Sequence, residues 1–92
     1  MKRSAFDPQA LSAYLQSVIR PLIGDASLRI EHRPNCPADG DHYWFIHVPR
    51  NLCGLLIGRN GDTAKGIRAL MRSFALQRQW TERVDARVVR PD

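Results

Sequence analysis

The sequence predicts an α+β fold in which helices pack on one face of a three-stranded sheet, with the element order α-β-β-α-α-β. Apolar residues recur at helical spacing in two long segments, which is typical of helices with one buried face. In three short segments apolar and polar residues alternate, which is typical of strands. A chain of 92 residues can bury one modest core, so we expect a single domain over residues 1–92.

The first helix is expected to begin at Pro8. Asp7 precedes it as the N-cap, and proline suits the first helical position because its missing N–H is not needed there. The apolar stripe of this helix consists of Leu11, Tyr14, Leu15, Val18, Ile19 and Leu22. Pro21 and Gly24 should end the helix.

Two strands are expected next, at Leu28–His32 and His42–Val48. The segment Arg33–Asp41 between them is rich in turn-forming residues. Alternation in the second strand divides its side chains between two faces, with Trp44, Ile46 and Val48 on one and Tyr43, Phe45 and His47 on the other. We expect Trp44 to lie in the core, since aromatic residues in the strands of small domains usually do.

A short helix is expected at Asn51–Ile57, after a proline stops the sheet. A longer helix should follow from Thr63 to about Gln79, with Asp62 as its N-cap. Its expected buried stripe is Ala64, Ile67, Leu70, Met71 and Phe74. A different, solvated and basic stripe consists of Lys65, Arg68 and Arg72. The last strand is expected at Val84–Val88.

The positive charge is concentrated in the second half of the chain. Residues 1–46 carry five Lys/Arg and five Asp/Glu, whereas residues 47–92 carry nine Lys/Arg and four Asp/Glu. The whole formal net charge of +5 therefore lies in the second half. A basic region of this kind favours a polyanionic partner.

The cysteines and histidines form no known metal-binding or disulfide pattern. Cys36 and Cys53 are too few for a disulfide framework, which favours the reducing cytoplasm. The spacing of His32, Cys36, His42 and His47 fits no zinc finger, so we expect no metal and no cofactor. No pair of carboxylates and no Ser/Cys–His pairing supports catalysis, so we do not expect an enzyme. No apolar run near the glycines is long enough to span a membrane.

The candidate site is the turn Gly58-Arg59-Asn60-Gly61 between the last two helices. Glycine permits unusual backbone angles and has no side chain to block a ligand. The following helix begins with free N–H groups and a partial positive charge, which suit phosphate oxygens. Arg59 adds a cation, and Asn60 tolerates a left-handed conformation. Gly54 and Gly66 are expected to allow close packing between the two helices.

The segment Leu55–Leu70, which contains this turn, resembles the signature of a KH domain, whose Gly-x-x-Gly loop clamps the backbone of four nucleotides. A helix and a strand precede a strand-helix-helix-strand core at about residues 42–90, which resembles the type II arrangement. The whole chain is similar to the small single-KH RNA-binding proteins of bacteria (KhpA/YlqC type). Ala64 departs from the pattern, because the family usually has a larger aliphatic residue there.

The resemblance implies a cytoplasmic RNA chaperone or regulator that holds single-stranded RNA on the loop and turns bases into an adjacent apolar groove. The residues expected to bind RNA are Gly54, Ile57, Gly58, Arg59, Asn60, Gly61, Lys65 and Arg68. The resemblance also implies a homodimer, or a heterodimer with a second KH-containing protein, and no membrane partner. Two alternatives stay open. One is a binder of single-stranded DNA, and the other is a KH-fold interaction subunit or scaffold, which the small Ala64 and the acidic Asp62 favour.

Overall fold

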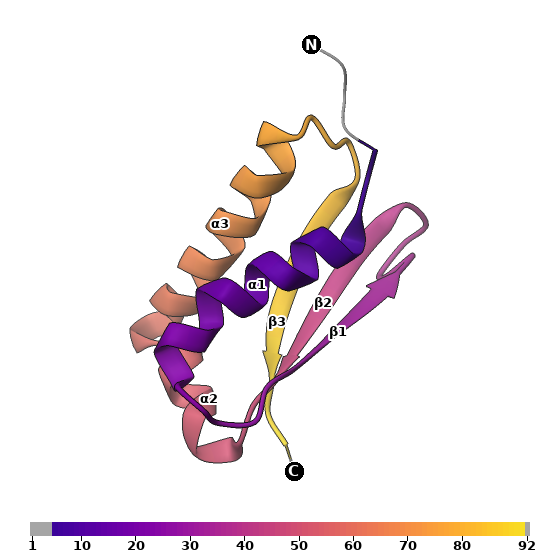
Figure 1. Cartoon of the computed structure of the whole chain (residues 1–92). Helices are drawn as coiled ribbons and strands as arrows, with labels where there is room; N and C mark the ends of the chain where they lie inside the picture. Colours follow the sequence, from indigo (N-terminus) through magenta and orange to yellow (C-terminus); the bar gives the residue numbers. More distant parts are fainter. Residues whose placement is uncertain (1–4, 92) are drawn as a thin grey trace.

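A computed structural model of the chain describes residues 5–91 (Figure 1). Residues 1–4 and 92 belong to the predicted domain but lie outside the described residues. The described elements, in chain order, are α1 (Pro8–Ile23), β1 (Arg29–Pro34), β2 (Asp41–His47), α2 (Arg50–Ile57), the short 3-10 helix η1 (Arg59–Gly61), α3 (Asp62–Gln77) and β3 (Arg83–Val89). The predicted α+β class and element order are therefore confirmed.

The sheet is mixed, and its strands lie in the order β1-β2-β3. Strands β1 and β2 are antiparallel, whereas β2 and β3 are parallel. A parallel pair needs a long crossover connection, and here α2 and α3 provide it. The register places Phe45 between Glu31 of β1 and Arg87 of β3. Figure 1 shows α1 crossing one face of the sheet and α3 running alongside β3, and no helix of the described chain covers the opposite face.

The core lies between this sheet and the helices. Leu11, Leu15 and Ile19 of α1 are fully buried and Tyr14 and Val18 are partly buried, as predicted. Leu22, the last residue of the predicted stripe, is instead 42% exposed, and Ile23 is buried in its place. Trp44 is also fully buried, as predicted, and its indole N–H donates a hydrogen bond to Ser12 Oγ at 2.8 Å. Complete burial of each such large apolar side chain stabilises the fold by about 1.5–3 kcal/mol. The core therefore holds the sheet against α1 through residues that the sequence pattern had indicated.

Of the two residues predicted to end α1, Gly24 does so, whereas Pro21 does not, because the helix continues to Ile23. A proline close to the end of a helix removes only one N–H donor. The helix ends at Gly24, whose φ of 62° is in the left-handed region and whose N–H donates to Arg20 O at 2.9 Å. The Arg20 guanidinium then donates to the Gly24 and Ala26 carbonyls, so these two carbonyl groups beyond the helix have hydrogen-bond partners.

The first strand is longer than predicted, because β1 runs on to Pro34. Its turn into β2 is correspondingly tighter. Asn35 has a φ of 56°, and its side-chain oxygen accepts a hydrogen bond from Gly40 N at 3.0 Å. This asparagine bond closes the turn and lets the strand pairing extend to Pro34 and His42.

Two predictions about α3 are wrong. Gly61, not Asp62, is the N-cap of α3, and it makes no side-chain cap hydrogen bond; Asp62 is the first helical residue. Leu70 is 45% exposed and does not belong to the core. The buried stripe of α3 instead consists of Ala64, Ile67, Met71 and Ala75. Leu70 lies beside this stripe, at the edge of the face that α3 turns toward the sheet.

Gly54 and Gly66 are not close-packing positions, contrary to the prediction. A Cβ atom added to either glycine would have no neighbour within 4 Å, apart from the backbone of its own helix. Cys53 and Trp80 are both buried. Cys53 is 4% exposed, and Trp80 is 7% exposed, with its indole N–H donating to Ala5 O at 3.0 Å. Trp80 therefore belongs to the core and is not a surface for stacking bases.

Within residues 5–91, no helix has both the length and the apolar character needed to cross a membrane.

Candidate nucleic-acid interface

The turn between α2 and α3 is built from left-handed backbone conformations. Gly58 has a φ of 76° and closes α2 through a hydrogen bond from its N–H to Gly54 O at 2.8 Å. Asn60 and Gly61 also have positive φ values, of 56° and 76°. Gly61 N donates to Gly58 O at 3.2 Å, which folds the turn back on itself. Arg59 and Asn60 are consequently exposed at its tip.

The two glycines of the turn are needed for different reasons. A Cβ atom at Gly58 would overlap the Thr63 side chain and lie 2.7 Å from Thr63 N, so the beginning of α3 leaves no room for one. A Cβ atom at Gly61 would meet only Lys65 Cε, at 4.0 Å. Gly61 is therefore favoured by its left-handed backbone alone, whereas Gly58 is also required by steric exclusion.

Helix α3 begins directly beside this turn without a side-chain cap. The first N–H groups of a helix lack intrahelical partners and carry a partial positive charge. The N–H of Asp62 donates to Arg59 O within the turn. The exposed Asp62 carboxylate lies in the first turn of α3 and is the one negative charge of that turn. The beginning of α3 can therefore accept an anion, in competition with Asp62.

A groove of about 650 Å³ extends from the turn over β3 to the open face of the sheet. We call it the α3–β3 groove. On its helical side it is lined by Ile57, Gly61, Ala64, Lys65 and Arg68. On its sheet side it is lined by Glu31, Arg33, Phe45, His47, Arg87, Val88, Val89 and Arg90. The floor is apolar, and the rim carries cations from both sides.

Several of these cations have no ionic partner. Within residues 5–91, Lys65, Arg87 and Arg90 form no ion pair and no side-chain hydrogen bond. Arg59 at the tip of the turn is likewise without such a partner in the described range. These four side chains are exposed and surround the groove and the turn. They can therefore bind phosphate groups without breaking an existing contact.

Arg68 and Arg72, in contrast, are engaged with β3. Arg68 Nε donates to Ala86 O at 3.1 Å and lies 3.7 Å from Asp85 Oδ1. Arg72 Nη2 lies 3.4 Å from Asp85 Oδ2. Asp85 thus partly neutralises two members of the predicted basic stripe. Of that stripe, Lys65 alone keeps a cation without an ionic partner in the described part of the chain.

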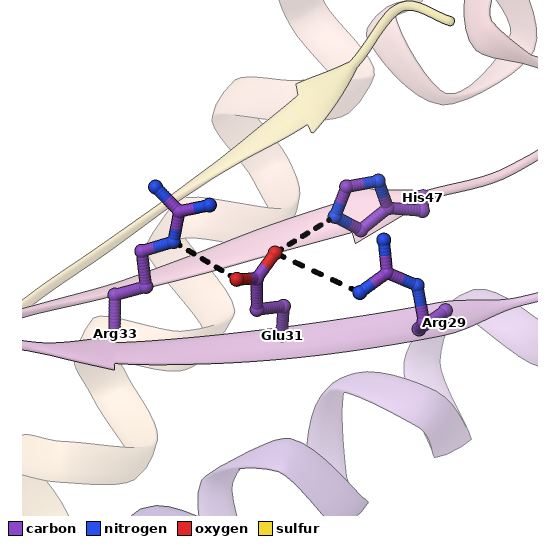
Figure 2. Close-up of polar contacts among 4 residues, drawn as sticks. All are labelled: Arg29, Glu31, Arg33 and His47. Carbon is purple, nitrogen blue, oxygen red and sulfur yellow. Dashed lines mark hydrogen bonds and ion pairs between the residues drawn. The ribbon is translucent and has the colours of Figure 1, made fainter.

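On the sheet side, Glu31 gathers three basic groups (Figure 2). Its Oε2 accepts a hydrogen bond from Arg33 Nε at 2.9 Å, and its Oε1 lies 3.2 Å from His47 Nε2 and 3.7 Å from Arg29 Nη1. The hydrogen bond from Arg33, followed by that from His47, lowers the pKa of Glu31 below its ordinary value. Glu31 is therefore ionised at neutral pH and holds Arg33 in place.

The groove brings together half of the residues that the sequence had indicated. Ile57, Gly61, Lys65 and Arg68 line it. Gly58, Arg59 and Asn60 form the adjoining turn, while Gly54 lies on the exposed surface of α2 and is not a lining residue. Sequence reasoning missed the contribution of the sheet, made by Phe45, Arg87 and Arg90 among others. The alternating pattern of the last strand separates Arg87 from the buried Val84 and Ala86, but it gives no sign of which strand lies beside it.

The other two histidines, His32 and His42, contact each other away from the groove. His32 Nε2 and His42 Nδ1 lie 2.8 Å apart, and the two rings stack, with Trp44 beside them. Burial, with the neighbouring His42 as a smaller cause, lowers the pKa of His32. From Ala5 to Pro91, no cluster of three or more His, Cys, Asp and Glu side chains could hold a metal ion.

Comparison of the chain with protein-family models, curated proteins and solved structures found no match. The class of the protein therefore follows from its fold and site. It is a small α+β domain with a mixed sheet, in which a glycine turn opens into a basic groove.

Proposed function

We propose that this chain is a KH domain of the type II arrangement that binds single-stranded RNA and catalyses no reaction. The observation that carries the proposal is the α3–β3 groove, which starts at the Gly58–Gly61 turn and has an apolar floor and unpaired cations on both walls. Single-stranded RNA fits such a groove because its bases are free to turn inward, whereas an A-form duplex hides them.

In this proposal the sugar-phosphate backbone lies on the glycine turn. One phosphate sits at the beginning of α3, between Arg59 and Lys65, where the bare backbone of Gly61 allows close approach. The bases enter the groove and pack on Ile57 and Ala64. Lys65 approaches the RNA from the helix, and Arg87 and Arg90 approach it from the sheet. Because most of these contacts are made to phosphate, base selectivity is mild.

A second candidate function, as a subunit that binds another protein, is favoured by exposed apolar side chains on α2 and α3. Leu55, Leu70 and Leu76 are 49%, 45% and 76% exposed. The two functions are compatible, since one module that holds four nucleotides gains affinity when it pairs with a copy of itself or a second KH-containing protein. Cys36 and Cys53 form no disulfide with each other, which favours the cytoplasm as the setting for a chaperone or regulator of RNA.

The test reverses the charge of the turn while keeping both glycines. The double variant Arg59→Asp/Asn60→Asp places two negative charges where the phosphate should lie. Both side chains are exposed, so the free energy of unfolding should change by no more than about 0.5 kcal/mol. The chain offers a matched control, because Arg50-Asn51 is the same dipeptide, is also exposed, and starts α2. Arg50→Asp/Asn51→Asp makes the same change in net charge.

Fluorescence anisotropy with a labelled single-stranded RNA measures binding, and circular dichroism with a thermal melt checks the fold. The turn variant should lose detectable binding, and the α2 variant should bind RNA nearly as the parent does. If the turn variant folds and binds RNA like the parent, the proposal is wrong. If the parent binds neither RNA nor single-stranded DNA but associates with itself, the subunit function replaces it.

A further inference from the structure

The face of the sheet opposite the helices carries an aromatic pair that the core does not use. Strand β2 turns Trp44 and Ile46 toward the helices, and alternation turns Tyr43 and Phe45 to the open face. The two rings are half-buried and stack, with centroids 5.1 Å apart and an angle of 26° between their planes. Neither ring contributes to the buried core of the domain.

Arg33 lies over the Phe45 ring and adds a guanidinium group to this aromatic pair. Its guanidinium carbon lies 4.7 Å from the centroid of the Phe45 ring. Figure 2 shows Arg33 held by Glu31 on β1, and the Arg33 side chain is 56% exposed. Nucleic-acid bases stack on aromatic rings and on guanidinium planes alike. The surface formed by Tyr43, Phe45 and Arg33, called here the sheet-face layer, therefore has the chemistry of a base-stacking platform.

The sheet-face layer is continuous with the proposed RNA site. Phe45 and Arg33 line the same α3–β3 groove as Gly61 and Lys65. Strand β3 lies between the two regions, and its Arg87 is paired in register with Phe45. A single-stranded RNA that leaves the glycine turn through the groove therefore passes over Arg87 and reaches Phe45.

The charges along this path favour a polyanion over a second copy of this chain. Arg87 and Arg90 have no ionic partner within residues 5–91. Glu31 is shared between Arg29 and Arg33, so this cluster keeps a positive charge beyond what the carboxylate neutralises. Two copies packed face to face would bring like charges together, whereas phosphates would neutralise them.

We infer that the open face of the sheet is a second contact surface for the same nucleic-acid strand. One or more bases beyond the four held at the turn stack on the sheet-face layer, and their phosphates contact Arg87 and Arg90. The inference rests on the proposed function, because it assumes that a strand occupies the groove. It extends the footprint from the glycine turn to the opposite face of the domain.

The test compares short and long RNA. Oligouridylates of about four and about eight nucleotides are titrated against the parent, Phe45→Leu and a control. A site that holds four nucleotides can bind the longer RNA in about five positions. The affinity for the longer RNA should therefore be about five times higher on statistical grounds alone. Stacking on the sheet-face layer should add a further factor of about 5 to 100 in the parent. Phe45→Leu should lose this further gain, because it should weaken binding of the longer RNA more than binding of the short RNA.

Phe74 provides the matched control. It is also half-buried, stacks on another tyrosine, Tyr14, at 4.6 Å, and lies under an arginine, Arg78, at 3.4 Å. It lies on α3 and does not line the groove. Phe74→Leu should therefore keep the gain of the longer RNA. Arg87→Gln is a second test that leaves the aromatic pair intact, and it should also reduce binding of the longer RNA more than that of the shorter.

The outcomes separate the inference from the proposed function. If the parent binds the short RNA but gains only the statistical factor from the longer one, the inference is wrong and the proposed function stands. The same holds if Phe45→Leu, shown by its thermal melt to be folded, keeps the whole gain. If the parent binds no oligonucleotide of either length, both are wrong. Self-association of the parent that Phe45→Leu abolishes would make the sheet face a dimer interface and overturn the inference.

Discussion

The dependence of RNA affinity on salt tests which cations meet phosphate. Arg59, Lys65, Arg87 and Arg90 have no ionic partner within residues 5–91, and each can neutralise one phosphate. For single strands the logarithm of the binding constant falls by about 0.7 per phosphate for each unit of log salt concentration. Four contacts therefore predict a slope of about −2.8 with an RNA long enough to reach all four cations. Between about 50 and 200 mM salt, this slope weakens binding about 50-fold.

Lys65→Ala should make the slope shallower by about 0.7, to about −2.1. The matched control is Arg72→Ala, which removes one positive charge from the same helix. Arg72 is bound to Asp85 and does not line the groove, so its removal should leave the slope unchanged. Anisotropy titrations at several salt concentrations measure both slopes, and a thermal melt confirms that each variant is folded. An unchanged slope in Lys65→Ala, or an equal effect in Arg72→Ala, would refute the proposal that Lys65 contacts a phosphate.

Two further predictions concern stability. Gly58→Ala should lower the free energy of unfolding by clearly more than Gly61→Ala, because only the Cβ at Gly58 overlaps Thr63. At Gly61 a left-handed alanine costs about 1–2 kcal/mol. Chemical denaturation compares the two variants, and equal losses of stability would contradict the steric argument. Because the pKa of His32 is lowered in the fold from the ordinary value of 6.5, the unfolded chain binds protons more readily, and stability should fall as pH drops through 6.5 and below. His32→Gln should weaken this dependence in denaturation curves at about pH 7.5 and 5.5, and the same dependence in parent and variant would exclude His32 as its source.

Local patterns predicted most of the fold. Helical spacing identified α1 and α3, and alternation separated Trp44 from Phe45 on the two faces of β2. The errors arose where tertiary context overrides a local preference. Asp62 is a good N-cap residue, but the left-handed Gly61 already occupies that position. Leu70 is as apolar as its neighbours, but the direction in which α3 packs leaves it at the edge of the buried face.

The candidate site was predicted only in part, for a related reason. The glycine turn is contiguous in the chain, so its residues could be identified from their spacing. Arg87 reaches the groove because β3 pairs in parallel with β2, and strand pairing between distant segments leaves no local signal. The same applies to Arg68, whose bond to Ala86 O depends on how α3 lies against β3. The sequence therefore indicated a cation at this place but not that β3 already binds it.

The contacts of Arg68 also affect whether a strand of another molecule can pair with the edge of this sheet. Strand β3 lies at one side of the sheet, where unpaired backbone groups invite a strand from another molecule to add to it. At Ala86 both groups are occupied by side chains, since its carbonyl accepts from Arg68 and its N–H donates to Asp85 Oδ1 at 2.8 Å. These two side chains therefore occupy the backbone groups that an added strand would need at Ala86. Arg68 is consequently a poor position for testing RNA binding, because a change there also uncovers the strand and alters solubility.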